Sequence, residues 1–447
     1  MTTGIRNPRD YAIINLTLLS SVATFDLKNI MTEISLAEDI FSNYVSGYVK
    51  IVESMGYIET LALNGTEYLR LTFSKSGDKS NQVDGIYRIF KVANRKLEGT
   101  MYKESYLLYF CSDELLLSEQ YKINKKYKSS LISDNVKDIL TNYLQAPSNK
   151  MSNGVIETTY GQYDFMIPFL KPYDAINFMT NYARPNPSNP GADMIFYENK
   201  YGFNFRSLQT MMKEPSYYTY TYKPKNLNST DLNTDVYNVT TYEILDSFDT
   251  LNGITQGTFA NQLISVNPMT RQRKVTNFDY GVYQQNSKNL NPNPIFDNST
   301  NRNGDRLNQT PQAMLKLIFS NYDSKSSSYI AGVPGAAGND IYAETYIPYR
   351  TAQLGLANYT RVRLSMPGDP NLTIGRVITF NLLSRQPNSS ELDKYYSGNY
   401  LITAVRHIID LTEYKTILEI TKESVPQPYP SNNNGTALWN NAVKGII

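Results

Sequence analysis

The sequence has very little of the side-chain chemistry that most enzymes and metal sites require. Among 447 residues there is one His (His407), one Cys (Cys111) and one Trp (Trp439). A His/Cys zinc site needs several such ligands and a disulfide needs two cysteines, so neither forms within one chain. Triad hydrolysis would depend on His407 alone. We therefore expect no catalytic, metal or cofactor-binding residues, and interpret His407 as a structural histidine on a strand.

Long apolar runs and an excess of charge are also lacking. The 43 Lys and Arg residues nearly balance the 41 Asp and Glu residues, which argues against wholesale binding to a polyanion. No stretch approaches the roughly 20 apolar residues that cross a bilayer. The apolar segment 11–23 is interrupted by Asn15 and Thr17, so it is a poor signal peptide. The sequence thus predicts a soluble protein without a secretion signal.

What the sequence has in abundance is tyrosine, with 37 residues, together with many Asn residues. Tyr favours half-buried pleated surfaces and interfaces, and Asn favours turns. A chain of 447 residues is long enough for two to four domains. These features predict a β-rich α+β fold with many short strands.

Apolar and β-branched runs predict strands near both ends of the chain. In the first 125 residues we expect strands over 11–19, 44–53, 57–63, 68–74, 85–92 and 102–110, with a hairpin turn at Asn64-Gly65. In the C-terminal third we expect strands over 361–366, 373–383, 399–410 and 414–422.

The centre of the chain has helical periodicity and one further hairpin. Helices are expected from Ser133 or Asp134 to Leu144, from Pro172 to Ala183, and over 310–318 with Thr310 as N-cap. A short hairpin is predicted over 194–206, and a second one pairs 261–266 with 274–280.

A short motif occurs in both β-rich regions. Gly85-x-Tyr87-x-Ile89-x-x-Val92 matches Gly398-x-Tyr400-x-Ile402-x-x-Val405, and each copy is followed by a turn and an apolar strand. We interpret the match as a structural repeat, with two similar β-barrel domains flanking α+β insert domains. The expected division is a first β domain over 1–125, an α+β domain over 126–215, a hairpin and helix insert over 216–340, a second β domain over 341–425 and a tail over 426–447.

Other patterns do not predict chemistry. The Gly-rich segment 332–338 lacks the Lys-Ser/Thr of a phosphate-binding loop. The carboxylate pairs Glu33/Glu38, Asp113/Glu114 and Asp246/Asp249 are compatible with glycoside hydrolysis, although none has a recognisable catalytic context.

Two regions resemble the central baseplate hub proteins of contractile-tailed, T-even-like phages. The first runs from Gly257-Thr258-Phe259-Ala260-Asn261 through Arg271 to Phe278-Asp279-Tyr280. The second joins Pro370-x-Leu372-x-Ile374-Gly375 to the second copy of the repeat and to Tyr414-x-x-x-Leu418. Segment 164–215 is also similar to the middle domain of that family.

The resemblance implies a structural virion protein of the tail baseplate, assembled in the host cytoplasm, with no enzymatic activity. It implies a homotrimer in which each chain supplies two β tube domains. Three chains then offer six similar barrels, which joins a threefold central spike to a sixfold tail tube or tube-initiator protein. Baseplate wedge proteins are further expected partners, and DNA would pass the channel without specific binding during genome ejection.

The tail from Pro426 is expected to be extended because of its Pro-rich start. Its apolar residues are candidate anchors on a neighbouring subunit or on the spike: Leu438, Trp439, Val443 and Ile446. Two alternatives to the hub remain open, namely a virion-associated cell-wall glycosidase and a glycan-binding tail module.

Overall fold

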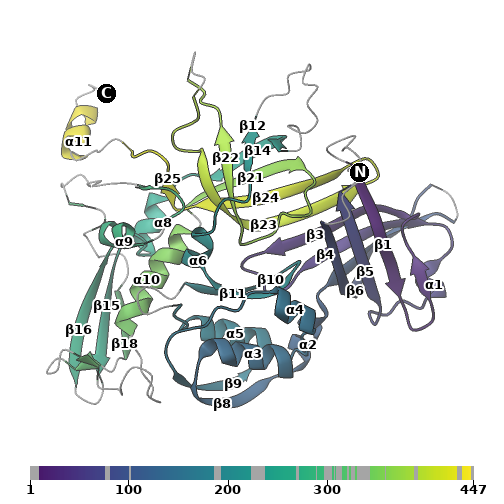
Figure 1. Ribbon diagram of the computed structural model, residues 1–447, viewed down its shortest axis with the longest axis horizontal. Coiled ribbons are helices and arrows are strands. Elements are labelled where there is room, and N and C mark those ends of the chain that lie inside the picture. Colours follow the sequence, from purple (N-terminus) through teal and green to yellow (C-terminus); the bar gives the residue numbers. More distant parts are fainter. Residues whose placement is uncertain are drawn as a thin grey trace.

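The computed structural model shows a β-rich protein built around one curled sheet (Figure 1). It describes residues 10–75, 81–99, 102–185, 193–222, 237–267, 271–287, 289–295, 305–306, 308, 315–319, 322–323, 328–329, 343–357, 359–386, 391–429 and 435–443. The largest sheet has 14 strands and contains both the N-terminal and the C-terminal strands. The β-rich α+β class predicted from the sequence is therefore confirmed.

The N-terminal strands form the first half of this sheet, in the order β3-β4-β7-β6-β5-β1-β2. Their bounds are β1 (Tyr11–Leu19), β2 (Thr24–Asp26), β3 (Met31–Asp39), β4 (Ser46–Glu53), β5 (Tyr68–Lys75), β6 (Gln82–Leu97) and β7 (Glu104–Cys111). Alternate apolar side chains such as Leu69, Leu71 and Phe73 are fully buried, because successive strand residues point to opposite faces. They fill a core of their own.

The C-terminal strands form the second half, together with three strands from the centre of the chain. Their bounds are β12 (Thr219–Tyr222), β13 (Asn238–Val239), β14 (Thr241–Asp246), β21 (Thr360–Pro367), β22 (Val377–Leu382), β23 (Gly398–Asp410) and β24 (Tyr414–Lys422). The pairings run β13-β12-β22-β23-β24-β21-β14. Only Thr240 separates β13 from β14, so these pairings close a ring around a second core.

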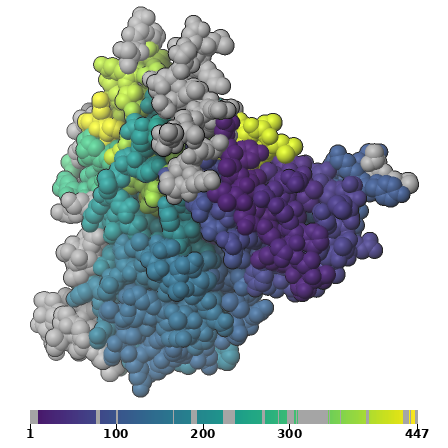
Figure 2. Space-filling view, turned by 45° about the vertical axis from the view of Figure 1, so that its right-hand side comes forward, coloured from purple at the N-terminus to yellow at the C-terminus, as the bar shows by residue number. Residues whose placement is uncertain are grey.

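The two halves meet where β3 pairs antiparallel with β23, from Glu33 opposite Asp410 to Asp39 opposite Ala404. The tip formed by β23 and β24 extends past this seam, and its residues Ile409 and Tyr414 are fully buried in the first core. Figure 2 shows part of the C-terminal third, in yellow, against the purple N-terminal half. The first half has no closing strand pair among the described residues, and the β23–β24 tip fills that place.

An α+β middle unit packs beside the first half (Figures 1 and 2). It contains α2 (Asp113–Gln120), β8 (Ile123–Ser130), α3 (Ile132–Asn142), α4 (Ser148–Asn153), β9 (Tyr163–Leu170), α5 (Pro172–Thr180), β10 (Met194–Asn199), β11 (Gly202–Ser207) and α6 (Leu208–Met212). The helices expected near 133–144 and from Pro172, and the hairpin over 194–206, are confirmed. The domain boundary expected at residue 125 falls inside β8.

The remaining elements form a smaller insert. They are α8 (Thr250–Thr255), β15 (Ala260–Asn267), β16 (Gln272–Asp279), α9 (Tyr280–Asn286), β18 (Leu315–Phe319), β19 (Tyr322–Asp323), β20 (Ser328–Tyr329) and α10 (Ala343–Leu356), with β17 (Asn293–Pro294) pairing β25 (Ser424–Val425). The β15–β16 hairpin is confirmed. Ala352 and Leu356 of α10, which were expected in the second β domain, share a core with Phe278 of β16.

Several other sequence-based predictions are wrong or incomplete. Residues 57–60 form helix α1 (Tyr57–Thr60), not a strand, because Glu53 accepts hydrogen bonds from the N–H groups of Gly56 and Tyr57 and starts a turn. Leu317 and Ile318 lie in β18, not in a helix, because they pair in parallel with β15. Strand β3 was not anticipated. In the tail, residues 435–443 form helix α11 (Gly435–Val443) instead of an extended chain.

Candidate functional site

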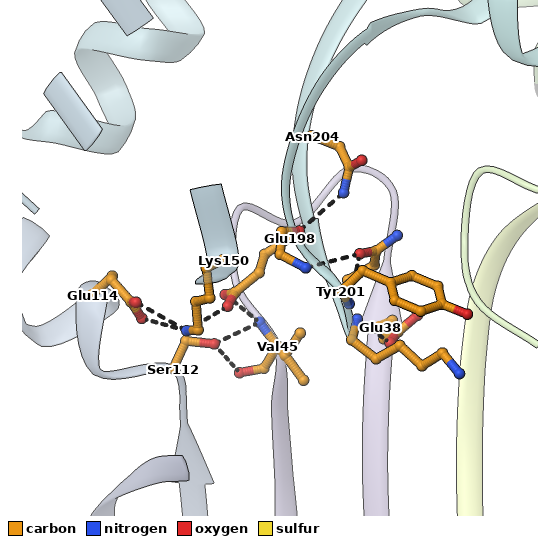
Figure 3. A network of polar contacts seen from close by, with 11 residues as sticks. Glu38, Val45, Ser112, Glu114, Lys150, Glu198, Tyr201 and Asn204 are labelled. Atoms are coloured by element: carbon orange, nitrogen blue, oxygen red, sulfur yellow. Dashed lines mark hydrogen bonds and ion pairs between the residues drawn. The ribbon is translucent and has the colours of Figure 1, made fainter. Parts of the chain in front are cut away.

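The candidate site is the junction where both halves of the sheet and the middle unit meet. Glu38, at the end of β3, is buried and accepts three hydrogen bonds. The donors are Thr373 Oγ1 at 2.6 Å, the Ile374 N–H at 3.3 Å and the Lys200 N–H at 2.7 Å. Burial raises the pKa of Glu38, and these hydrogen bonds oppose the rise. One carboxylate thus connects the first half, the segment before β22 and the β10–β11 turn (Figure 3).

A buried ionic network lies next to Glu38 (Figure 3). Lys150 of α4 lies 2.8 Å from Glu114 of α2 and 2.7 Å from Glu198 of β10. Glu198 also accepts a hydrogen bond from the Val45 N–H at 3.3 Å. Burial lowers the pKa of Lys150, but the two carboxylates outweigh burial and the net shift is upward. Lys150 therefore stays charged and joins α2, α4 and β10 within the middle unit, while Glu198 contacts the β3–β4 connection through Val45.

The network lines a groove of about 710 Å³ between the first half and the middle unit. Its walls also include Tyr68, Arg70 and Asp84 from β5 and β6. Because Lys150 is engaged by both carboxylates, the arrangement joins elements and leaves no free acid and base pair at this point.

The carboxylates that were considered for hydrolysis either lie apart or already have structural partners. Glu33 accepts a hydrogen bond from Tyr48 on the exposed face of β3, while Glu38 points to the buried face. Asp113 accepts a hydrogen bond from Tyr68, and Glu114 binds Lys150. Asp246 pairs with Arg361, and Asp249 caps α8 by accepting from the Asn252 N–H. Asp113 and Glu114 line one groove and Asp246 and Asp249 line another, but each of these carboxylates has a structural partner there.

His407 and Cys111 are both buried. The Nδ1 atom of His407 lies 2.8 Å from the Tyr414 hydroxyl, and the ring meets Phe73 edge-on at 5.9 Å. Burial lowers the pKa of His407 to about 3, so the imidazole is neutral at physiological pH. Burial raises the pKa of the Cys111 thiol to about 12. Among the described residues no group of three His, Cys, Asp or Glu side chains is placed to hold a metal ion.

None of the helices in the described ranges combines the length and apolar character needed to cross a membrane.

A largely polar face, with Ile408, Ile417 and Leu107 among its residues, runs across both halves of the sheet on the side away from the two cores. We call it the polar sheet face; strand register places on it Glu243, Asp246, Arg361, Arg363, Lys415, Glu419, Arg406, Asp410, Glu33, Ser35, Tyr48, Lys50, Tyr109 and Lys91.

Opposite charges on the polar sheet face lie next to one another. Arg363 pairs with Glu243 at 3.0 Å, and Arg361 lies 3.3 Å from Glu419. Arg406 crosses the seam and donates to Ser35 at 2.8 Å. The face is therefore charged but largely self-neutralised.

The two copies of the repeat lie on β6 and β23, each in the middle of a three-strand meander. Gly85 and Tyr87 are opposite Leu71 and Leu69 of the preceding strand, and Ile89 is opposite Phe110 of the following one.

The second copy repeats this pattern. Gly398 and Tyr400 are opposite Phe380 and Ile378, and Ile402 is opposite Ile420. In both strands the register shifts directly after the shared Ile, between Ile89 and Lys91 and between Ile402 and Ala404.

The side chains of the repeat are mostly core residues. Tyr87 and Ile89 are buried in the first core, with Val92 partly buried against it, and Tyr400, Ile402 and Val405 are buried in the second. The two glycines differ: Gly398 has a φ of +120°, and a Cβ there would lie 2.6 Å from Asn291, whereas Gly85 leaves room for the ring of Tyr87.

Of the candidate tail anchors, the described residues place Trp439 and Val443 on α11, where they are 45% and 67% exposed. Leu438 lies on the same helix, and Ile446 lies outside the described residues.

The chain is similar over most of its length to a curated phage protein. It is 22% identical over 410 residues to the probable baseplate hub protein gp334 of Vibrio phage KVP40, covering 89% of this chain and 91% of that protein. No family model matches the sequence. The resemblance to baseplate hub proteins that the sequence motifs indicate is confirmed by this relative.

Two solved structures share the fold. The tail protein from Neisseria meningitidis MC58 superposes with a TM-score of 0.51 at 10% identity, covering 94% of this chain and all (100%) of that one. The 43 kDa tail protein of prophage MuSo2 from Shewanella oneidensis has a TM-score of 0.50 at 8% identity, covering 92% and 99%. Identities this low establish a shared fold and nothing finer.

Proposed function

We propose that this chain is a structural hub of a phage tail baseplate. The observation that carries the proposal is its similarity to a probable baseplate hub protein across 89% of the chain. The junction supports it, because Glu38 holds three units in one arrangement by buried contacts. A scaffold that transmits force between other proteins needs such fixed joints.

In this role the hub is a homotrimer at the tail axis, joining the threefold central spike to the sixfold tail tube. The equivalent pairings around Tyr87 and Tyr400 support two similar β units in each chain. Three chains then present six such units in a ring, so one side matches threefold symmetry and the other matches pseudo-sixfold symmetry. The tail tube or its initiator and the baseplate wedge proteins are the further partners.

The polar sheet face is the surface that we assign to the DNA channel. Binding to phosphates requires an excess of Lys and Arg, whereas here Arg363 and Arg361 are paired with Glu243 and Glu419. A self-neutralised wall lets DNA pass without holding it. This arrangement requires no catalytic residue in the hub.

Two measurements test the proposal: the mass of the assembled protein and its location in the phage particle. Light scattering of the purified chain is expected to give three times the 50.9 kDa chain mass. A chain that stays monomeric at micromolar concentration, alone and with the spike protein, contradicts the trimer. Electron microscopy of particles that carry an affinity-labelled copy is expected to place the label on the axis at the baseplate. A label on the fibres or along the tail contradicts the hub.

A further inference from the structure

Part of strand β6 has a strand partner on one side only. β6 has 16 residues, whereas its neighbour β7 has 8. Pairing with β7 covers Arg88 to Leu97, so residues 82–87 pair with β5 alone. We call residues 82–87 the open edge of β6, because no described strand lies along their other side. Exposed edges commonly carry Lys or Pro, which hinder pairing with another chain, and this one has neither.

The unpaired backbone groups of the open edge point away from β5. Ile89 directs its N–H to the Glu67 carbonyl on the β5 side, at 3.0 Å. Backbone groups alternate between the two sides along a strand, and the β5–β6 register is uninterrupted from 82 to 88. The N–H and C=O groups of Asp84 and Ile86 therefore face the other side, where the described residues offer them no hydrogen-bond partner.

The groove between the first half and the middle unit runs along this edge. Its lining contains Asp84, Gly85, Ile86 and Tyr87 in succession, and consecutive strand residues face alternate sides of the sheet. The opposite wall comes from α2, from α4 and the connection before it, and from the β10–β11 turn. β7 ends at Cys111 and is followed by α2, so the groove occupies the place that a longer β7 would take.

The wall opposite the open edge carries amide side chains. Gln145, Asn149 and Asn153 line the groove, are exposed, and make no side-chain hydrogen bond within the described part of the chain. An amide side chain offers both an N–H donor and a C=O acceptor. A strand placed along β6 has a second edge, and its backbone groups need partners of both kinds. The groove therefore has hydrogen-bonding groups for both sides of an extended backbone.

The side chains at the open edge indicate what such a strand would carry. Ile86 is 52% exposed, so an apolar neighbour would cover it. Asp84 accepts a hydrogen bond from the Thr72 hydroxyl and has no ion pair with a described Lys or Arg. Opposite charges on directly opposed residues of neighbouring strands attract, which favours a Lys or Arg opposite Asp84. The groove as a whole has four acids against three bases: Asp84, Asp113, Glu114, Glu198, Arg70, Lys150 and Lys200.

We propose that the open edge of β6 accepts an extended segment of another protein as an added strand, with a Lys or Arg opposite Asp84 and an apolar residue opposite Ile86. The added strand continues the sheet beyond the end of β7 and lies against the middle unit. Asp84 and Ile86 are two positions apart, so both partner residues lie on one face of the added strand. Backbone pairing supplies affinity, and the two side chains supply selectivity. This inference does not depend on the hub proposal.

Hydrogen exchange read at single residues tests the open edge directly. In the free full-length chain the amides of Asp84 and Ile86 should exchange fast, while those of Val83 and Gly85, which face β5, should be protected. The probe is the capped peptide acetyl-Thr-Val-Thr-Lys-Thr-Val-Thr-amide, which places Val and Lys two positions apart on one face. At saturating concentration it is expected to slow exchange at Asp84 and Ile86 by about tenfold or more.

A second peptide, with Glu in place of Lys, tests the charge preference. Calorimetry should show it binding up to about fivefold more weakly, as expected for the loss of one opposed charge pair. Asp84→Lys is expected to reverse the order of the two peptides. The matched control is Asp26→Lys, which makes the same charge change on β2, outside the groove, and should leave the order unchanged.

Ile86→Pro tests the backbone pairing itself. The substitution removes an N–H that faces the groove and no bond to β5, so the chain should still fold and both peptides should bind more weakly. A variant that binds both peptides as tightly as the unmodified chain would contradict pairing at this edge.

Three further results would overturn the proposal. If Asp84 and Ile86 are protected in the dilute free chain, the edge already has a partner within that chain. If their protection grows with protein concentration without peptide, copies of the chain pair with one another there. If neither peptide slows their exchange, or if Asp84→Lys leaves the order of the peptides unchanged, the added strand or its charge preference is wrong. These results are separate from the mass and location tests of the hub.

Discussion

The two halves of the sheet share a hairpin pattern but complete their cores differently. In the second half, β12, β13 and β14 close a ring around the core. The first half has no such closing strands among the described residues; instead Ile409 and Tyr414 of the β23–β24 tip enter its core. Glu38 and Glu198 then fix the middle unit to it. The first half is therefore completed by residues from other parts of the chain.

This difference predicts where each half is vulnerable. A core closed by its own strands loses stability when its own side chains change. A core completed from outside also loses stability when a remote element changes. The first half should thus respond to substitutions in β23 and β10, and to Lys150 of α4 through its pair with Glu198, although none of these belongs to its own strands.

The largest expected effect comes from Lys150→Met in the buried network. Removing the cation leaves Glu114 and Glu198 buried without a counter-charge, at a cost of about 3–5 kcal/mol in the free energy of unfolding. Urea denaturation measures the loss. Lys171→Met, which removes an exposed pair with Glu119, should be silent in the same assay. Equal effects of the two substitutions would contradict the role of the network.

Ile409→Ala is expected to be next in size, at about 2–5 kcal/mol, because it opens a cavity in the first core. Hydrogen exchange should show faster exchange in β1 and β5, while β21 and β22 stay protected. Ile420→Ala in the ring is the matched control and should expose the second half instead. If Ile409→Ala releases both halves together, the comparison between them fails.

Two buried groups, His407 beside Phe73 of the first core and Lys422 in the second half, should make stability respond to opposite ends of the pH range. His407 has a pKa near 3 in the fold and near 6.5 when unfolded, so the unfolded chain binds more protons between these values. Stability from this group is therefore lost as pH falls from about 6.5 towards 3, by up to about 1.4 kcal/mol per pH unit. Unfolding of His407→Gln should show a slope shallower by that amount. An unchanged slope would show that His407 is not kept neutral in the fold.

Lys422, in the second half, should make stability depend on pH in the alkaline range. Burial lowers its pKa to about 7, and its Nζ donates to the Ser397 carbonyl at 2.9 Å. The unfolded chain holds the proton up to about pH 10.5, so stability should rise with pH above 7. Lys422→Met should remove this rise between pH 7 and 9 and leave the acid limb unchanged. If stability still rises above pH 7 in the variant, other titratable groups cause the rise.

The smallest effect is expected on the polar sheet face. Arg363→Ala removes an exposed pair with Glu243 and should cost only about 0.2–1 kcal/mol. Its informative readout is binding of a DNA oligonucleotide to the assembled protein, compared with Glu243→Ala, which leaves Arg363 unpaired. Only the Glu243 variant should gain salt-dependent affinity. Tight DNA binding by the unmodified protein would contradict a neutral channel wall.

Much of the fold could be predicted because its information is local. Alternating apolar residues predict β5, β7, β21 and β24, and the 3.6-residue period predicts α3. Strand β3 was missed because the charged Glu38 occupies a core-facing position after Ile34 and Leu36, and its burial depends on contacts with the middle unit. β18 was taken for a helix because its apolar run is short, and only pairing with β15 decides its state.

The candidate site was even harder to predict from the sequence than the fold. The repeat around Tyr87 and Tyr400 was found because its residues are close in sequence. Glu38 and Lys150 carry no local signal: Glu38 meets Thr373, 335 residues away, and Lys150 meets Glu114, 36 residues away. A buried Glu next to a partly buried Lys is recognisable only when both are placed in space.

By itself, the sequence determined that this protein has few groups for catalysis, that it is β-rich, and that two of its strands share a motif. These properties depend on composition and on short spacings between residues, which can be read directly from a linear sequence. The tertiary structure alone decided that one half closes as a ring and the other is completed from outside. Such closure depends on contacts between residues hundreds of positions apart, whose burial outweighs any local preference.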